Sequence, residues 1–79
     1  MIRFIEIDNP ITHNRVRIDF NDEDYNIGFF ERFSDSEELK EFNKWRFVPN
    51  NSALEYQNSK SIEHSIIIDG EDVSILTLL

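Results

Sequence analysis

Residues 64–79, HSIIIDGEDVSILTLL, decide the predicted architecture, because two apolar runs flank an Asp-Gly pair. Asp69-Gly70 is typical of a type I′ hairpin turn, since both central residues need positive φ and glycine has no Cβ to oppose it. A loop of two residues and a loop of four residues both remain open. In either register, the same four side chains share one face: Ile66, Ile68, Val73 and Ile75. The stretch therefore predicts a β-hairpin with a buried face.

The opposite face of this predicted hairpin is also apolar, since it carries Ile67, Leu76 and Leu78. One amphipathic helix covers only one side of a small sheet. Large contiguous apolar patches are rarely left in water. We therefore expect a sheet that curls into a barrel-like shape, or a second molecule that covers this face. That molecule is either a second copy, which would give a homodimer through Ile67, Leu76 and Leu78, or another protein that docks there.

Alternation of apolar and polar residues predicts three further strands. Residues 15–20 alternate strictly, and residues 25–29 follow the same pattern, although their phenylalanines would also suit a helical face. Residues 2–7 have apolar side chains on both faces, which indicates a central strand joined to residues 15–20 through the turn-forming DNPITHN. Gly28 indicates a bulge or a close approach of backbone.

One main helix is predicted to begin at the stretch SDSE, where Ser34 as N-cap and Glu37 form a capping box. We expect it to pack through Leu39, Phe42 and Trp45 and to end around residues 44–46, before Pro49. Residues 49–61 read as a polar loop with one helical turn around residues 53–56. This loop is either a binding loop or a plain connector.

The fold class that follows is α+β: a mostly antiparallel sheet of four to five strands, curled in the barrel-like alternative, with one main α-helix. Residues 1–79 are expected to form a single small acidic domain, because a chain of this length has no surplus for a second core. The absence of cysteine favours a reducing compartment, and the first residues do not resemble a secretory signal. We therefore expect a cytoplasmic protein without a membrane partner.

The formal charge of −8 argues against direct binding of nucleic acid, which depends on lysine and arginine. It permits a protein partner with a basic surface, although acidic composition also serves solubility alone. The candidate acidic face comprises Asp22, Glu23, Asp24, Glu37, Glu38 and Glu41. If those carboxylates were spaced like phosphates, the chain would be an acidic mimic that blocks a DNA- or RNA-binding protein. Lys40 and Lys44, which lie among the glutamates, argue against mimicry.

A second candidate surface is a mixed basic and apolar patch on the first predicted hairpin. If its core face is Ile2, Phe4, Val16 and Ile18, the other face presents Arg3, Ile5, Arg15 and Arg17. Arginine with apolar neighbours is a composition found at interface centres. Pairing of the arginines with nearby carboxylates is the alternative.

Motifs for chemistry are missing from the sequence. Neither register of a calcium-binding loop fits the acidic turn, and the two histidines, His13 and His64, have no partners at metal-ligand spacing. No nucleophile elbow or glycine-rich phosphate loop occurs. We therefore predict no catalytic residue, metal ligand or cofactor, and a non-enzymatic interaction protein such as a regulator, inhibitor or accessory subunit. A small hydrolase or metal-dependent enzyme would require His13 or His64 to lie beside several carboxylates in a pocket.

Overall fold

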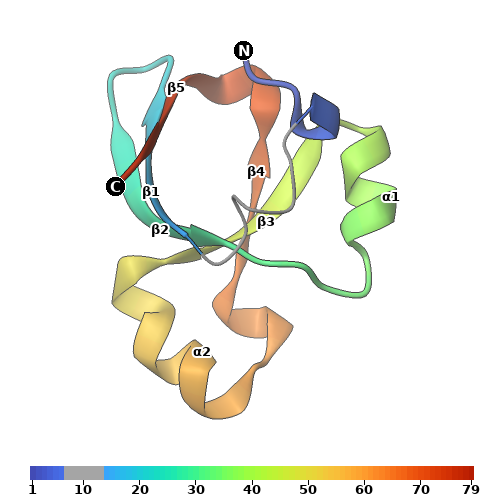
Figure 1. Cartoon of the computed structure of the whole chain (residues 1–79), viewed down its shortest axis with the longest axis vertical. Coiled ribbons are helices and arrows are strands. Elements are labelled where there is room, and N and C mark those ends of the chain that lie inside the picture. Colours follow the sequence, from blue (N-terminus) through green and yellow to red (C-terminus); the bar gives the residue numbers. More distant parts are fainter. Residues whose placement is uncertain (7–13) are drawn as a thin grey trace.

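The computed structural model describes residues 1–6 and 14–79, and its centre is one sheet of five antiparallel strands (Figure 1). The strands are β1 (Arg15–Phe20), β2 (Tyr25–Phe30), β3 (Lys44–Pro49), β4 (Ile66–Asp69) and β5 (Val73–Leu78). Their order across the sheet is β4-β3-β2-β1-β5. The predicted α+β class with an antiparallel sheet is confirmed.

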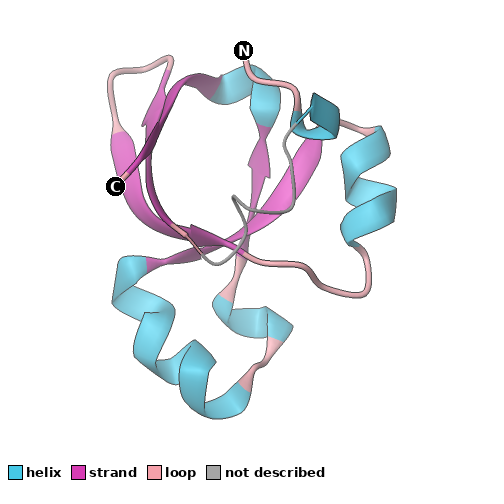
Figure 2. Ribbon diagram, in the orientation of Figure 1, coloured by secondary structure: helices cyan, strands magenta, loops and turns pink. Residues whose placement is uncertain are grey.

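The described helices are short and lie outside the sheet (Figure 2). The α-helices are α1 (Ser36–Glu41) and α2 (Ala53–Ser59), and the 3-10 helices are η1 (Phe4–Glu6), η3 (Asn50–Ser52), η4 (Ile62–His64) and η5 (Gly70–Asp72). None of the helices in residues 1–6 and 14–79 is long and apolar enough to cross a membrane.

The sheet is strongly curled, as the barrel-like alternative predicted. Strands β4 and β5 are its two opposite edges, yet only the three residues of η5 join them. The sheet must therefore bend until both edges reach η5, although the edges do not pair with each other. The concave side holds the core, in which Phe30 packs edge-on against Phe4 and Phe47 with ring centres 5.5 and 5.2 Å apart.

The predicted C-terminal hairpin is wrong, because β4 pairs with β3 and β5 pairs with β1. Gly70 does not have positive φ and starts η5, while the Asp69 carboxylate accepts a hydrogen bond from the Glu71 amide. Gly70 is required for a different reason. A Cβ there would collide with the Ile2 carbonyl oxygen and lie 2.6 Å from the Asn43 side-chain nitrogen, so the backbone approaches too closely for any side chain.

The predicted shared face of this segment is also only partly correct. Ile68 and Val73 are buried, whereas Ile66 and Ile75 are 41% and 58% exposed. The pairing of β5 with β1 shifts its register between Asp19 and Phe20. This irregularity places Val73 opposite the inward-facing Phe20 but Ile75 on the outer face, so the two side chains no longer point the same way.

The predicted N-terminal strand is wrong within residues 2–6, because Phe4–Glu6 forms η1. Asn43 holds this segment through its side chain: Oδ1 accepts from the Phe4 amide at 2.8 Å, and Nδ2 donates to the Ile2 carbonyl at 2.8 Å. These bonds place the Phe4 ring in the core, 2% exposed. Ile7 and residues 8–13 of the predicted turn lie outside the described residues.

The predicted main helix is shorter than expected. Helix α1 ends at Glu41, and Asn43, with φ of 59°, reverses the chain into β3, where Trp45 points to the core. Phe42, expected to pack, is 67% exposed. The N-cap is Asp35 without a side-chain cap bond, not Ser34. Conversely, the predicted helical turn at residues 53–56 is the start of α2, which continues to Ser59.

Strands β1 and β2 confirm the predictions for residues 15–20 and 25–29. Gly28 marks the predicted close approach, since a Cβ there would collide with the Val48 carbonyl oxygen and lie 2.8 Å from the Phe47 ring. Glycine therefore leaves room at this point for the backbone and the Phe47 side chain of the neighbouring strand β3.

Candidate functional site

The clearest site arises where β3 stops pairing with β2. Strand β1 pairs with β2 along residues 25–29, but β3 pairs with β2 only along Gly28–Phe30. At Pro49 the chain leaves the strand and enters η3. In the described part of the chain, residues 25–27 of β2 therefore have no strand partner on the β3 side.

An open pocket of about 500 Å³ lies at this edge, and we call it the β2 groove. Its lining residues are Asp24, Tyr25, Asn26, Ile27, Asn50 and Asn51. Each of the three asparagine amides offers both a carbonyl acceptor and an NH₂ donor, which is the hydrogen-bonding capacity of a peptide group. Ile27 and the Tyr25 ring supply apolar surface, and Asp24 supplies a negative charge.

Tyr25 is held in place from one side although its side chain is exposed. The Arg17 guanidinium lies 4.2 Å from the centre of the Tyr25 ring, a cation-π contact. Asp19 in turn fixes Arg17, whose Nε and Nη2 donate to Oδ1 at 3.1 and 3.0 Å. Tyr25 is 53% exposed. The ring is therefore oriented before any ligand arrives, which lowers the entropy lost on binding.

The acidic residues predicted as one face are divided between two places. Asp22, Glu23 and Asp24 form the β1–β2 turn beside the β2 groove, whereas Glu37, Glu38 and Glu41 lie on α1, on the opposite side of the molecule in Figure 1. A nucleic-acid mimic needs one row of carboxylates, which this arrangement does not supply. Glu37 also accepts a hydrogen bond from Arg32 Nη1 at 2.6 Å.

The predicted basic and apolar patch is divided as well. Arg15 and Arg17 lie on the outer face of β1. Arg3 and Ile5 lie instead at the N-terminal segment, in a shallow pocket whose lining residues are Met1, Arg3, Ile5, Lys40, Glu41, Asn43 and Glu71. The reason is that residues 4–6 form η1 and not a strand beside β1.

The residues predicted for self-association lie on the two edge strands of the sheet. Ile67 is 47% exposed on β4, at one edge of the sheet, while Leu78 is 62% exposed on β5, at the other edge. Leu76, also on β5, is partly buried against the core. The strand order therefore places Ile67 and the two leucines on different edge strands.

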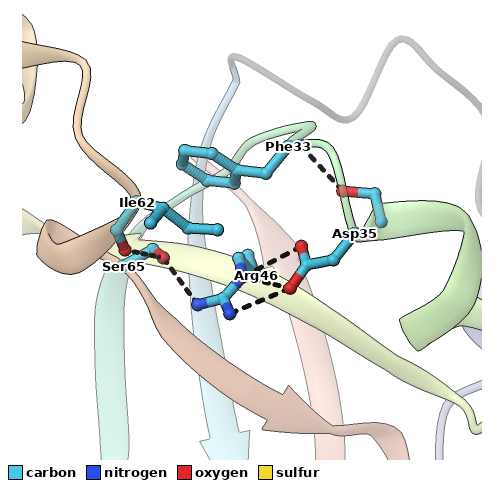
Figure 3. Close-up of polar contacts among 6 residues, drawn as sticks. Phe33, Asp35, Arg46, Ile62 and Ser65 are labelled. Carbon is cyan, nitrogen blue, oxygen red and sulfur yellow. Dashed lines mark hydrogen bonds and ion pairs between the residues drawn. The ribbon is translucent and has the colours of Figure 1, made fainter.

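Arg46 forms a polar clamp that sequence reasoning missed (Figure 3). Its Nε and Nη2 donate to the Asp35 carboxylate at 2.9–3.1 Å, and its Nη1 donates to Ser65 Oγ at 3.1 Å. Ser65 Oγ donates to the Ile62 carbonyl at 2.6 Å. The clamp connects β3 with the start of α1 and the segment before β4. Hydrogen bonding to Arg46 lowers the pKa of Asp35, despite an opposing effect of burial.

A second apolar cluster lies between α2 and the sheet. The Tyr56 ring lies 5.9 Å from the Phe29 ring and 5.7 Å from the Phe33 ring, centre to centre. Burial raises the pKa of Tyr56, and the charge of Glu31 raises it further. The cluster fixes the segment that carries Asn50 and Asn51, because α2 follows η3 directly.

The described residues include one of the two histidines, His64. His64 Nε2 lies 3.9 Å from Glu63 Oε1, its neighbour in sequence. Within residues 1–6 and 14–79, no three His, Asp or Glu residues are placed to hold a metal ion. His13 lies outside these ranges.

The groove residues Tyr25, Asn26, Asn50 and Asn51 were missed as a site by sequence reasoning. The available signal is the Asn-rich loop after Pro49, for which a binding loop is one of two interpretations. The loop gives no sign that β3 stops pairing with β2 at Gly28, because that depends on long-range pairing.

Comparison of the chain with protein-family models, curated proteins and solved structures found no significant match.

Proposed function

We propose that the chain is a non-enzymatic interaction module that binds a segment of another protein in the β2 groove. The observation that carries this proposal is the open edge of β2 at residues 25–27, bordered by Asn50 and Asn51. An exposed strand edge can accept an extended peptide as an additional strand, through main-chain hydrogen bonds.

The groove chemistry suits a main chain more than a reactive small molecule. Asparagine amides can satisfy both the N–H and the C=O of a bound peptide, which would otherwise lose hydrogen bonds to water. Ile27 and the preset Tyr25 ring provide apolar contact for one or two side chains of the ligand. Tyrosine is enriched at interface positions that dominate binding energy.

The charge around the groove indicates which peptides fit. Asp24 lines it, and Asp22 and Glu23 precede Asp24 in the same turn. With a chain charge of −8, the approach of a basic segment is accelerated and that of an acidic segment is slowed. We therefore expect the bound segment to be extended and to carry lysine or arginine next to its apolar residues.

Selection from a displayed library of random ten-residue peptides tests this proposal with the whole chain as bait. Asn50→Ala combined with Asn51→Ala removes two groove amides. The matched control, Gln57→Ala with Asn58→Ala, removes two exposed amides on α2. Loss of two hydrogen bonds of about 1 kcal/mol each weakens the selected peptides about 30-fold. The control should change affinity less than twofold.

Two results would contradict the proposal. One is a selection that enriches no peptide above background. The other is a set of peptides that bind the groove variant as tightly as the unaltered chain, which would place their site elsewhere. Raising the salt concentration from about 50 to 500 mM should weaken the selected basic peptides, because screening acts on exposed charges.

A further inference from the structure

The two ends of the β2 groove differ in charge. At one end is the acidic β1–β2 turn, from which Asp24 lines the groove directly. Asp22 and Glu23 precede Asp24 in that turn and are exposed. At the other end, where β3 leaves β2, the groove is lined by the uncharged side chains of Asn50 and Asn51. A bound peptide also has two chemically different ends, so the two directions in which it can lie are not equivalent.

The backbone of β2 offers particular groups to a ligand in this groove. The Asp24 carbonyl faces β1, because it accepts from the Phe20 amide at 2.8 Å. Pairing of β2 with β1 is regular from Tyr25 onward, and backbone groups alternate in direction along a strand. The amides and carbonyls of Tyr25 and Ile27 therefore face away from β1, toward the groove. The Glu31 amide agrees with this alternation, since it donates to a β3 carbonyl at 3.2 Å.

One of the groups that face the groove is already occupied. The Tyr25 amide donates to Asp24 Oδ1 at 2.8 Å. An antiparallel ligand along residues 25–27 would bond to both groups of Tyr25, so it would have to displace Asp24. A parallel ligand bonds instead to the carbonyl of one residue and to the amide two residues later. The Tyr25 carbonyl and the Ile27 amide are such a pair.

We infer that the peptide in the β2 groove runs parallel to β2, with its N-terminal end toward Asp24. This inference rests on the proposed function and deepens it by fixing the direction of the ligand. One ligand residue lies opposite Asn26, donates its N–H to the Tyr25 carbonyl and accepts from the Ile27 amide. The bond from the Tyr25 amide to Asp24 stays intact in this arrangement.

Electrostatics favour the same direction. Asp24 and the two acidic residues before it attract an N-terminal ammonium group or nearby lysine and arginine side chains, and they repel a terminal carboxylate. At the other end, the NH₂ groups of Asn50 and Asn51 can donate to carbonyl or carboxylate oxygens of the ligand. The ligand is therefore an extended segment whose basic residues lie near its N-terminal end.

Spin labels on the ligand test its direction without altering the chain. A peptide selected from the displayed library is synthesised with a nitroxide at either end and added to isotopically labelled chain. The N-terminal label should broaden the amide signals of Asp22, Glu23 and Asp24 more strongly, and the C-terminal label those of Asn50 and Asn51. The reverse pattern, or equal broadening of both sets by both labels, would overturn the parallel direction.

The position of the positive charge on the ligand gives a second test. Two versions of the peptide have blocked termini and carry a lysine pair either at the N-terminal or at the C-terminal end. The N-terminal version should bind about two- to fivefold more tightly, as expected for an exposed ion pair. Asp24→Asn keeps an oxygen for the Tyr25 amide but removes the charge, so it should abolish most of this difference. The matched control, Glu38→Gln on α1, should preserve it. Equal affinities of both versions for the unaltered chain would overturn the assignment of the basic end to Asp24.

Failure of this inference can be distinguished from failure of the proposed function. If the combined change of Asn50 and Asn51 to alanine leaves the affinity of the peptide unchanged, its site lies elsewhere and both proposals fail. If that variant weakens binding but the spin labels give the reverse pattern, the β2 groove remains the site and only the direction is wrong.

Discussion

Asn43 should be among the side chains with the largest effect on stability relative to their size. Its side chain bonds to the Phe4 amide and the Ile2 carbonyl, both at 2.8 Å, and its own carbonyl accepts from the Gly70 amide at 2.9 Å. It also has φ of 59°, a left-handed conformation that asparagine tolerates better than most residues. One residue thus joins the N-terminal segment, the end of α1 and η5.

Asn43→Ala removes both side-chain bonds and retains a Cβ at positive φ. Two bonds contribute about 1 kcal/mol each, and left-handed backbone costs alanine about 1 kcal/mol, so the expected loss is about 3 kcal/mol. A chain of this length typically has about 4–12 kcal/mol of stability. Asn43→Gly loses the same bonds without the backbone cost, so it should lose about 2 kcal/mol.

Equilibrium unfolding in urea at neutral pH measures both variants. Hydrogen exchange of the Phe4 amide gives a local check, since this N–H loses its acceptor in either variant. If Asn43→Ala were as stable as the unaltered chain, the pinning role of Asn43 would be refuted. If alanine and glycine gave equal losses, the backbone contribution would be refuted and the side-chain bonds alone would remain.

Three further predictions concern the clamp, the sheet and α2. Asp35→Asn should lose about 1–3 kcal/mol at pH 7, because it breaks charged bonds to Arg46. The pKa of Asp35 is lowered by folding, so its stabilisation is present above the unfolded pKa and is lost as the pH falls through the folded one. Urea titrations should therefore show the stabilities of Asp35→Asn and the unaltered chain converging as the pH falls below the unfolded pKa of Asp35, and a difference that does not shrink with falling pH would contradict this assignment. Gly28→Ala should cost at least about 2 kcal/mol in thermal or urea unfolding, because the added Cβ collides with the Val48 carbonyl; a neutral effect would show that β2 and β3 can separate without loss. The pKa of Tyr56 is raised by folding, so stability should fall as the pH rises above roughly 10, and Tyr56→Phe should reduce this alkaline loss in urea unfolding. An unchanged alkaline loss in Tyr56→Phe would assign it to other groups.

Local patterns were sufficient for elements whose faces are set by their own alternation. Residues 15–20 alternate strictly and form β1, and residues 25–29 form most of β2. Gly28 signalled a close approach because glycine weakens a strand and is retained inside one mainly where a side chain has no room. The α+β class followed from these strands, the helix signals and the shortage of chain for a second layer. In these cases, the alternation of side chains along the strand is sufficient to predict the element.

Local patterns did not predict which strands pair with each other. Residues 66–69 and 73–78 are strands as predicted, yet the Asp-Gly signal between them led to a hairpin that does not exist. The apolar stretch of residues 44–49 was divided between a helix end and an extended segment, although it forms the strand between β2 and β4. Local propensity competes here with burial of Trp45 and Phe47 on the concave face, and burial wins.

By itself, the sequence determined the residues that alternate, the lack of cysteine, the acidic charge and the close backbone approach at Gly28. Only the tertiary structure decided that β4 and β5 lie at opposite edges and that the acidic residues are separated. It also decided that β3 pairs with β2 only along Gly28–Phe30, which leaves the β2 groove open. The physical reason is the distance along the sequence between the residues that interact. Alternation is a property of neighbouring residues, whereas strand pairing and groove formation depend on contacts between residues far apart in the chain, whose free energy is shared across the whole sheet.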